Sequence, residues 1–396
     1  MPTSTFTLPP DARILVVKLA TIGDLLLATP ALRALRETYP RARIDLLVTP
    51  ASAGLLDGWE VIDNVIVLDK YLFDYPQQLL KNPRNMLKLR PLWHNLRDGK
   101  YDVVILMHHL TLFFGRLKHQ VLMRATGARW RVGLDNGHGW FLNVRVKDGG
   151  FGAMHEAEYC LALAEALGAS TNDRRLTLPL SEAERQQARE LVCGQDPSGA
   201  VGEATPPTAH PIIALHPGSG GYSTARRWSP RHFAQLADTL YREFGGQLLL
   251  VGGPEEAELH QQIIAMLRTA MPARSLAGKG SIKVSGAVLE LADLFIGNDA
   301  GPMHLAAAVG TPTVAIFGLS NSQAWGPYTG CAPGQPDRQT VVVKLDLPCM
   351  PCFYRGHDLG TPEGCMTRDC LAMLGVEPVA AAARHLLRAS GIGVDL

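Results

Sequence analysis

The sequence predicts an α/β fold in which two doubly wound, Rossmann-like domains follow one another and face a cleft. Short apolar strands alternate with amphipathic helical segments along the 396-residue chain. Residues 194–211 interrupt this alternation with three glycines and four prolines, as an interdomain linker would. A chain of this length also exceeds one ordinary hydrophobic core. We therefore expect an N-terminal domain over 1–193, a C-terminal domain over 212–375 and a final helix over 376–396.

Each expected element follows from its hydrophobic period. In the first domain the expected strands occupy residues 13–18, 44–48, 65–68 and 102–107, and the expected helices occupy 24–39, 153–167 and a segment opened by a capping box at 181–184. In the second domain the expected strands occupy residues 212–215, 247–251, 295–297 and 313–317, with one helix that Ser229 caps before Pro230 and another that ends at Val309. This order predicts parallel sheets wrapped by helices.

The composition is that of a globular protein without a strong global charge. Hydrophobic residues make up 46% and charged residues 19% of the chain, and 38 basic against 37 acidic residues leave a net charge of +1. Nucleic acid is therefore not expected as a principal partner. Residues 1–10 lack the features of a signal peptide and no apolar stretch is long enough to span a bilayer, so a cytoplasmic location is expected.

The most informative stretch is 295–318, where a buried strand passes through a tight turn into an alanine-rich helix. Asp299, Gly301 and His304 fall where the strand ends and the helix begins. Open α/β sheets bind ligands at that edge, and a helix N-terminus offers backbone amides to an anion. Asp299 could instead only cap the helix. Capping explains neither the glycine nor the histidine one turn later.

Asp24 holds the corresponding position in the first domain. It ends the loop that follows the first strand, so its carboxylate is expected at the carboxyl edge of the N-terminal sheet. A carboxylate there is suited to act as a general base, and the helix dipole would stabilise its ionised form. From this motif alone, a helix cap is the commoner interpretation.

Three more residues follow strands of the second domain. Ser219 lies in the glycine-rich loop 214–221, whose amides could approach a phosphate, and Arg226 supplies positive charge before the next helix. Glu255 is placed to accept hydrogen bonds from a ribose diol. Each feature alone is as readily a surface turn or an exposed helix start. Together with the residues of 295–318, they all fall at strand-to-helix edges of one domain, which favours a binding site.

Four of the seven cysteines cluster in the loop 347–371, where they form CxxC followed by CxxxxC. They are Cys349, Cys352, Cys365 and Cys370. Sulfur ligation of a structural zinc or iron ion suits such spacing, and His357 could replace one thiolate. Unligated thiols are the alternative. A redox CxxC is less favoured because no strand leads directly into a helix there.

A basic run extends from Lys81 to Lys100, with Trp93 among its cations. Such a run could meet an anionic acceptor or the surface of a membrane. A solvated helix face is the commoner explanation.

Two long motifs resemble those of glycosyltransferase family 9, the heptosyltransferases that build the inner core of bacterial lipopolysaccharide. Residues 14–36 are similar to the family's opening signature and residues 297–312 to its closing one. The resemblance implies a GT-B fold, an ADP-heptose-type donor on the C-terminal domain and inversion at the anomeric carbon. It implies an anionic glycolipid or glycoprotein acceptor on the N-terminal domain, and no catalytic metal.

Carried over by position, Asp24 matches the family's catalytic carboxylate and becomes the expected base. Arg226 falls where the family usually has a phosphate-binding lysine, and Glu255 where an acidic residue meets the ribose. The donor motif falls on Asp299, Gly301 and His304. Ala300, within that motif, replaces a frequent Ser or Thr. The cysteine loop resembles one in a subset of the family that includes heptosyltransferases of autotransporter proteins, so lipid and protein acceptors both stay open.

Two hypotheses from other classes also fit the sequence. A sugar-nucleotide epimerase can share the two-domain architecture, but it needs acid and base residues on both sides of a sugar and no separate acceptor. A noncatalytic, metal-bearing assembly factor would bind a nucleotide sugar weakly or not at all.

Overall fold

The computed structural model describes residues 8–70, 84–193, 210–331 and 339–393. The chain divides into two compact units, one of Met1–Arg174 with Gly356–Asp358 and the other of Arg175–Arg355 with Leu359–Leu396. Helix α7 (Glu182–Cys193) belongs to the second unit because it packs on α10 (Ile282–Glu290) of that unit. The sequence had placed the boundary after residue 193. Most of the expected linker 194–211 lies outside the described residues.

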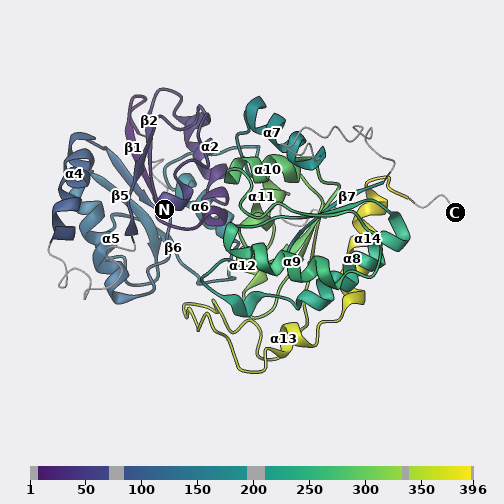
Figure 1. Cartoon of the computed structure of the whole chain (residues 1–396). Coiled ribbons are helices and arrows are strands. Elements are labelled where there is room, and N and C mark those ends of the chain that lie inside the picture. The colour runs from purple at the N-terminus through teal and green to yellow at the C-terminus, as the bar shows by residue number, and fades with distance from the viewer. Residues whose placement is uncertain (1–7, 71–83, 194–209, 332–338, 394–396) are drawn as a thin grey trace. The chain divides into compact units, whose positions relative to one another are not determined.

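The first unit is built on a six-stranded parallel sheet with the order β3-β2-β1-β4-β5-β6 (Figure 1). The strands are β1 (Arg13–Lys18), β2 (Arg43–Val48), β3 (Asn64–Val67), β4 (Val103–Leu106), β5 (Trp130–Asp135) and β6 (Val144–Lys147). The helices are α1 (Ile22–Leu26), α2 (Thr29–Thr38), α4 (Arg84–Asp98), α5 (Phe113–Ala125) and α6 (Glu156–Glu165), with a 3-10 turn at Pro50–Ser52. Helices α2 and α6 pack on each other, as do α4 and α5. Alternate residues of β1 point to opposite faces, and Leu15 and Val17 share a core with Leu96 of α4 and Leu122 of α5.

The second unit repeats this plan with the strand order β12-β11-β10-β7-β8-β9. Its strands are β7 (Ile212–His216), β8 (Gln247–Leu250), β9 (Ala273–Ser275), β10 (Leu294–Asn298), β11 (Thr313–Ile316) and β12 (Thr340–Val343). Besides α7 and α10, its helices are α8 (Pro230–Phe244), α9 (Ala257–Met266), α11 (Gly301–Val309), α12 (Ser322–Trp325), α13 (Asp369–Ala372) and α14 (Val376–Ala389), with 3-10 turns at Thr224–Arg226 and Pro254–Glu256. Helix α8 packs against α14 and α9, whereas α10 packs against α7 and α11. The expected doubly wound α/β fold is confirmed in both units.

The strand order defines where each unit can bind a ligand. In each sheet the first strand of the unit pairs with its second strand on one side and its fourth strand on the other, so the direction of strand order reverses between the first and the fourth. These strands are β1 and β4 in the first unit and β7 and β10 in the second. Doubly wound sheets bind ligands outside the carboxyl ends of the strands at this reversal. Asp24 follows β1, Ser219 and Arg226 follow β7, and Asp299 follows β10.

One expected helix is divided in two. The periodicity predicted a single helix from Asp24 to about Tyr39, but α1 ends at Leu26 and α2 starts at Thr29. Pro30 has no N–H to donate to the carbonyl of Leu26, and the hydroxyl of Thr29 donates to that oxygen at 2.7 Å instead. Proline is favoured in the first turn of a helix, so it starts α2.

None of the described helices is long and apolar enough to cross a lipid bilayer.

Candidate active site

The buried side chain of Asn298 joins the loops at the carboxyl edge of the second sheet. Asn298 ends β10, and its side-chain amide donates to the carbonyls of Pro217 and Gly218 at 2.8 and 3.0 Å. Its Oδ1 accepts from the backbone N–H of Trp228 at 3.0 Å. One side chain therefore holds both ends of the segment between β7 and α8.

Arg226 connects two of the residues singled out in the sequence. One guanidinium nitrogen donates to the backbone oxygen of Asp299 at 2.8 Å and to its carboxylate at 3.2 Å, and the other donates to the carbonyl of Ser219 at 3.0 Å. The Ser219 hydroxyl donates to the carbonyl of Ser223 at 2.7 Å and accepts from Arg227 at 3.2 Å. The structure thus brings Ser219, Arg226 and Asp299 into one cluster.

Asp299 does not cap the helix that follows it. The N-cap of α11 is Ala300, and its backbone is extended. Gly301 is the first helical residue, and His304 lies one turn later, buried, with 4% of its surface exposed. A helix N-terminus carries partial positive charge. The carboxyl end of β10 therefore combines that charge with the guanidinium of Arg226.

Glu255 lies on the neighbouring strand connection, in the 3-10 turn after β8, and it is exposed. Its neighbour Glu256 is buried, and one oxygen accepts from the amide of Gly253 at 3.3 Å. A Cβ at position 218 would fall 1.6 Å from the other carboxylate oxygen, so Gly218 lets the loop after β7 lie against Glu256. The difference in burial between the two glutamates depends on tertiary packing, so local sequence does not predict it.

The motif alone suggested that Asp24 is the N-cap of a helix. In the structure Thr21 is the N-cap of α1, and Asp24, the third helical residue, accepts hydrogen bonds from it. The amide and hydroxyl of Thr21 both donate to Oδ2 of Asp24, at 3.2 and 2.7 Å. These two hydrogen bonds hold the carboxylate at the carboxyl end of β1.

Buried basic groups that the sequence did not single out lie at the same edge. Lys18, the last residue of β1, is 3% exposed and donates to the carbonyl of Met107 at 3.0 Å. Burial alone would lower the pKa of Lys18, but Cys160, Asp24 and Glu156 raise it above its usual value. Lys18 therefore carries a positive charge close enough to Asp24 to favour the ionised carboxylate.

Two adjacent histidines follow β4 and hold different charges. His108 accepts from the amide of Leu19 at 2.7 Å, and burial, with Lys18 nearby, holds its pKa well below the usual value. His109 lies between Asp148 at 2.9 Å and Glu156 at 2.8 Å. Burial would lower the pKa of His109, but these two hydrogen bonds raise it to about 9. The two histidines directly after a buried strand were the available sequence signal.

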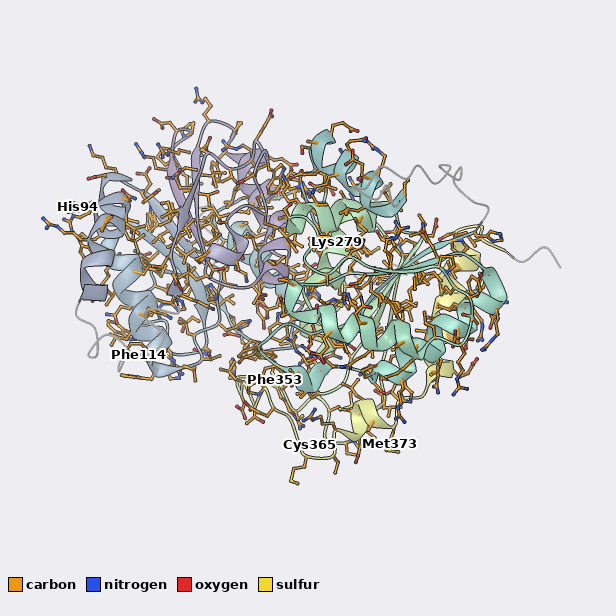
Figure 2. The ribbon with its side chains drawn as sticks, viewed as in Figure 1. His94, Phe114, Lys279, Phe353, Cys365 and Met373 are labelled. Atoms are coloured by element: carbon orange, nitrogen blue, oxygen red, sulfur yellow. The ribbon has the colours of Figure 1, made fainter. Side chains whose placement is uncertain are left out.

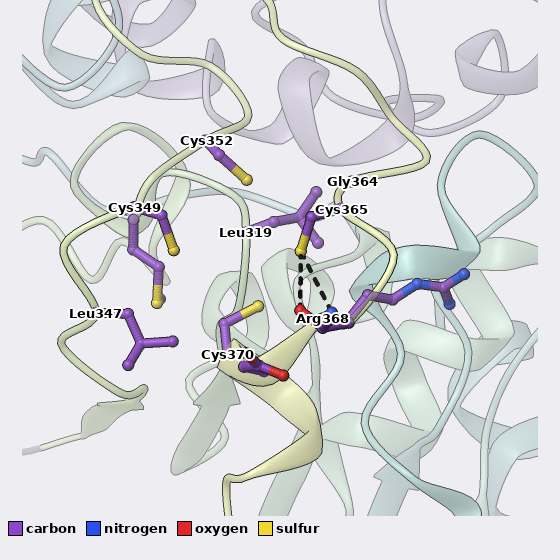
Figure 3. Close-up of a pocket in the computed structure, with 11 residues that line it drawn as sticks. Leu319, Leu347, Cys349, Cys352, Gly364, Cys365, Arg368 and Cys370 are labelled. Atoms are coloured by element: carbon purple, nitrogen blue, oxygen red, sulfur yellow. Dashed lines mark hydrogen bonds between the residues drawn. The ribbon is translucent and has the colours of Figure 1, made fainter.

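The four clustered cysteines line one cavity of the second unit. It has a volume of about 60 Å³, and Figure 3 shows Cys349, Cys352, Cys365 and Cys370 reaching it from three segments of chain. Burial and the neighbouring thiols raise the pKa of Cys370 to about 11, whereas hydrogen bonds from Arg368 and Thr367 lower the pKa of Cys365. All four are free thiols. Among the described residues no three His, Cys, Asp or Glu side chains have the arrangement of a metal-ligand set.

His357 does not line that cavity, which removes it as the alternative fourth ligand in this structure. Gly356–Asp358 belong to the first unit. There Nε2 of His357 lies 3.3 Å from the carbonyl oxygen of Asp148 and 3.5 Å from its carboxylate. The amide of Phe151 also donates to the carbonyl of Gly356. This tip of the cysteine loop is therefore held through the same Asp148 that contacts His109.

The model of glycosyltransferase family 9 (heptosyltransferase) matches residues 89–361. Since this match covers well over half of the chain, the chain belongs to glycosyltransferase family 9. The matched range includes the Arg226 cluster and the donor motif of α11, whereas Asp24, Cys365 and Cys370 lie outside it. Family membership makes the chain a glycosyltransferase and sets aside both the epimerase and the assembly-factor hypotheses.

The chain is similar to characterised relatives along most of its length. Lipopolysaccharide heptosyltransferase 2 of Escherichia coli (strain K12) is 28% identical over 324 residues, covering 80% of this chain and 86% of the relative. Among solved structures, the glycosyl transferase family 9 protein of Veillonella parvula DSM 2008 matches with a TM-score of 0.70 at 23% identity, covering 96% of this chain and 97% of that one. The iron-containing dodecameric glycosyltransferase TibC from enterotoxigenic E. coli H10407 matches with a TM-score of 0.53 at 16% identity, covering 97% and 78%. These likenesses confirm the GT-B fold class.

The position of His109 predicts a pH-dependent stability. Its folded pKa of about 9 exceeds the usual 6.5, so its contribution is complete below pH 6.5 and is lost as the pH rises through about 9. The difference in melting temperature between wild type and His109→Gln should therefore be largest below pH 6.5 and shrink toward pH 9. Thermal unfolding at a series of pH values measures it. His138→Gln, at an exposed histidine of the same unit, is the control, and a difference that does not vary with pH would contradict the assignment.

Proposed function

We propose that this glycosyltransferase moves a heptose, or a similar sugar, from an ADP-activated donor to a lipopolysaccharide core or another bacterial glycoconjugate, with inversion at the anomeric carbon. The observation that carries the proposal is the cluster of Ser219, Arg226 and Asp299 at the strand reversal of the second sheet. The relative in E. coli K12 is a lipopolysaccharide heptosyltransferase and supports the same substrate class.

The second unit supplies groups suited to a nucleotide diphosphate. Arg226 is a fixed cation beside the N-terminus of α11, and its buried Nε has no hydrogen-bond partner in the structure. That nitrogen is enclosed by protein, but 16% of the Arg226 side chain is exposed, so its charge is accessible to a bound anion. In this proposal Arg226 and the helix N-terminus stabilise the departing diphosphate, Glu255 accepts from the ribose, and His304 orients the phosphate or the sugar.

The first unit supplies the base. In this proposal Asp24 takes the proton from the acceptor hydroxyl as its oxygen attacks the anomeric carbon, and the bond from that carbon to the diphosphate breaks. Two features of the structure support this role. The contacts from Thr21 fix the orientation of the carboxylate, and the charge of Lys18 favours its ionised form.

A protein acceptor is the second candidate. The observation that favours it is the four-cysteine loop, which resembles that of the family subset acting on autotransporter proteins. For either acceptor, we propose that the enzyme acts in the cytoplasm, where reducing conditions keep thiols available, with peripheral contact to the inner membrane.

A transfer assay tests the proposal and separates the acceptors. The purified chain is incubated with ADP-heptose and either heptose-deficient lipopolysaccharide core or an autotransporter passenger domain, and the acceptor is analysed by mass spectrometry. We expect one acceptor to gain the mass of a heptosyl residue while ADP is released. Release of ADP without a glycosylated acceptor, or transfer only from other nucleotide sugars, would contradict the proposed reaction.

Arg226→Ala should weaken the binding of ADP and of the donor by about 1.5–3 kcal/mol, the range for a hydrogen bond that involves a charged group. Isothermal titration calorimetry measures the loss. Arg227→Ala is the matched control and should lose less, because the Arg227 guanidinium donates to the Ser219 hydroxyl, whereas Arg226 contacts Asp299 beside the helix N-terminus. Equal losses at the two positions would show that the phosphate contact is assigned to the wrong arginine.

Asp24→Asn should bind the donor nearly as wild type does but lose transfer by about 10²–10⁴-fold. Asparagine keeps an oxygen that can accept from Thr21, so the start of α1 should be preserved while the base is removed. Thr21→Val is the complementary control, since it removes the hydroxyl donor and keeps the carboxylate. Single-turnover kinetics measures the effect, and an Asp24→Asn variant with more than about a tenth of wild-type turnover would exclude Asp24 as the base.

We also propose that Cys349, Cys352, Cys365 and Cys370 hold a structural zinc or iron ion. The four thiols are not arranged as a ligand set in this structure, but they line one cavity and are the soft donors these ions prefer, so ligation would draw them together. The similarity to TibC, an iron-containing glycosyltransferase, is consistent with this proposal. A full set of four protein ligands leaves no position for substrate, so the ion would order the loop and take no part in transfer.

Protein purified without chelator should contain about one zinc or iron ion per chain, and ligation can contribute on the order of 10 kcal/mol to the folding of such a loop. Cys352→Ser should lose both metal and thermal stability, with a smaller effect on donor affinity than Arg226→Ala. Cys193→Ser, an exposed cysteine outside the cavity, is the control. Elemental analysis and thiol titration measure the outcome, and a metal-free protein with four reactive thiols would refute the site.

A further inference from the structure

Helix α5 of the first unit has an apolar stripe that faces solvent. Phe113, Leu117 and Val121 are 79%, 45% and 52% exposed, and their spacing of four residues places them on one face of the helix. On the opposite side, Leu122 and Met123 are buried in the core beneath the sheet. A surface helix ordinarily has a single apolar face turned to the core. The exposed stripe is therefore additional to what folding requires.

The stripe continues into a larger surface. Leu112, the N-cap of α5, is 63% exposed, and Trp140 is 62% exposed. The guanidinium of Arg124, in the last turn of α5, lies 5.1 Å from the ring centre of Trp140, which connects that residue to the end of the helix. We define the α5 patch as Leu112, Phe113, Leu117, Val121 and Trp140. Figure 2 marks this helix by the label of Phe114.

The charge around the α5 patch is mainly positive, although Asp98 ends α4 and Asp135 accepts from the amide of Gly139, next to Trp140. Residues 103–134 contain no Asp or Glu, and their Lys and Arg residues are Arg116, Lys118, Arg124, Arg129 and Arg131. Helix α4 lies beside α5 (Figure 1) and carries exposed Arg90, Arg97 and Trp93. These belong to the basic run predicted over Lys81–Lys100; Lys81 and the side chains of 84–89 lie outside the part of the chain that the structure describes.

We propose that the α5 patch docks the first unit on the surface of an anionic phospholipid bilayer. Phe113, Leu117 and Val121 would enter the boundary between headgroups and acyl chains, and Trp140 would lie at the level of the headgroups. The surrounding cations match the negative charge of the leaflet, and the absence of acidic residues from 103–134 disfavours a surface balanced for another copy of the chain. This inference rests on the peripheral membrane contact proposed above, and it assigns that contact to one helix.

Vesicle sedimentation tests the surface directly. The full chain should bind vesicles of phosphatidylcholine mixed with phosphatidylglycerol, bind pure phosphatidylcholine much less, and release as salt screens the charges. The triple variant Phe113→Ser, Leu117→Ser, Val121→Ser should lose about tenfold or more in affinity because three apolar side chains no longer enter the lipid. Arg124→Glu should lose about tenfold or more because it reverses a charge near the bilayer and removes the guanidinium that lies over Trp140.

Matched controls show whether position matters. Met266→Ser with Val342→Ser removes exposed apolar side chains of the second unit, and Arg268→Glu reverses an exposed charge there. Both controls should bind vesicles as wild type does. Should the triple variant fold poorly, Leu117→Ser and Arg124→Glu are tested singly. In addition, the fluorescence emission spectrum of Trp140 is obtained by subtracting the spectrum of Trp140→Phe from that of wild type. A blue shift on anionic vesicles supports the proposal, and no shift opposes it.

Several outcomes would overturn the inference. Wild type that ignores anionic vesicles, or a triple variant that binds them as wild type does, excludes the α5 patch as the membrane contact. A dimer in ultracentrifugation that the triple variant loses, without vesicle binding, assigns the patch to a second copy. Transfer to water-soluble acceptors, a core oligosaccharide and an autotransporter passenger domain, separates the two proposals. If transfer to either acceptor is intact while vesicle binding is absent, only the membrane contact fails. If transfer to both acceptors is absent while vesicles bind, only the proposed reaction fails.

Discussion

The side-chain amide of Asn298 is the constraint on which the candidate donor site depends. It is fully buried, and all three of its hydrogen bonds go to backbone groups 70 to 81 positions earlier in the chain. An apolar side chain there would leave two buried carbonyls and one N–H without that partner. Because the amide holds the start and the end of the segment 217–228, it fixes the approach of Arg226 to β10. The ion pair of Arg226 with Asp299 follows from that approach.

The two units apply one topology to different chemistry. In both sheets the loops after the first and fourth strands meet at the reversal of strand order. In the second unit these loops bring an arginine and a helix N-terminus together, which suits an anion. In the first unit they bring a carboxylate close to the buried charge of Lys18, which suits an ionised base. Neighbouring residues at each edge, more than the fold itself, therefore decide what each unit can do.

Residues whose positions are set by local chain geometry were predictable, and contacts that depend on distant partners were not. The strand-to-helix edges placed Ser219, Arg226 and Asp299 correctly at one end of one sheet, although their contacts span up to 73 positions. His109 gave no comparable signal because its carboxylate partners lie 39 and 47 residues further along. The burial of Glu256 next to the exposed Glu255 depends on packing against Gly218, which local sequence does not reveal. Pro30 was a sequence signal for the break before α2, but the hydrophobic pattern, which continues past Pro30, predicted a single helix.

The arginine at position 226 departs from the lysine that the resemblance led us to expect, and the structure supplies a reason. Its two terminal nitrogens donate in different directions, one to Asp299 and one to the carbonyl of Ser219. A lysine ammonium is a compact charge on a flexible stem, whereas a guanidinium presents its donors in a rigid fork. At this position one side chain must therefore both join the loops after β7 and β10 and offer charge to a ligand. A lysine could carry the charge, but it would contact both loops through a single nitrogen. In this chain the guanidinium of Arg226 therefore both connects the two loops and provides the proposed contact to the anion.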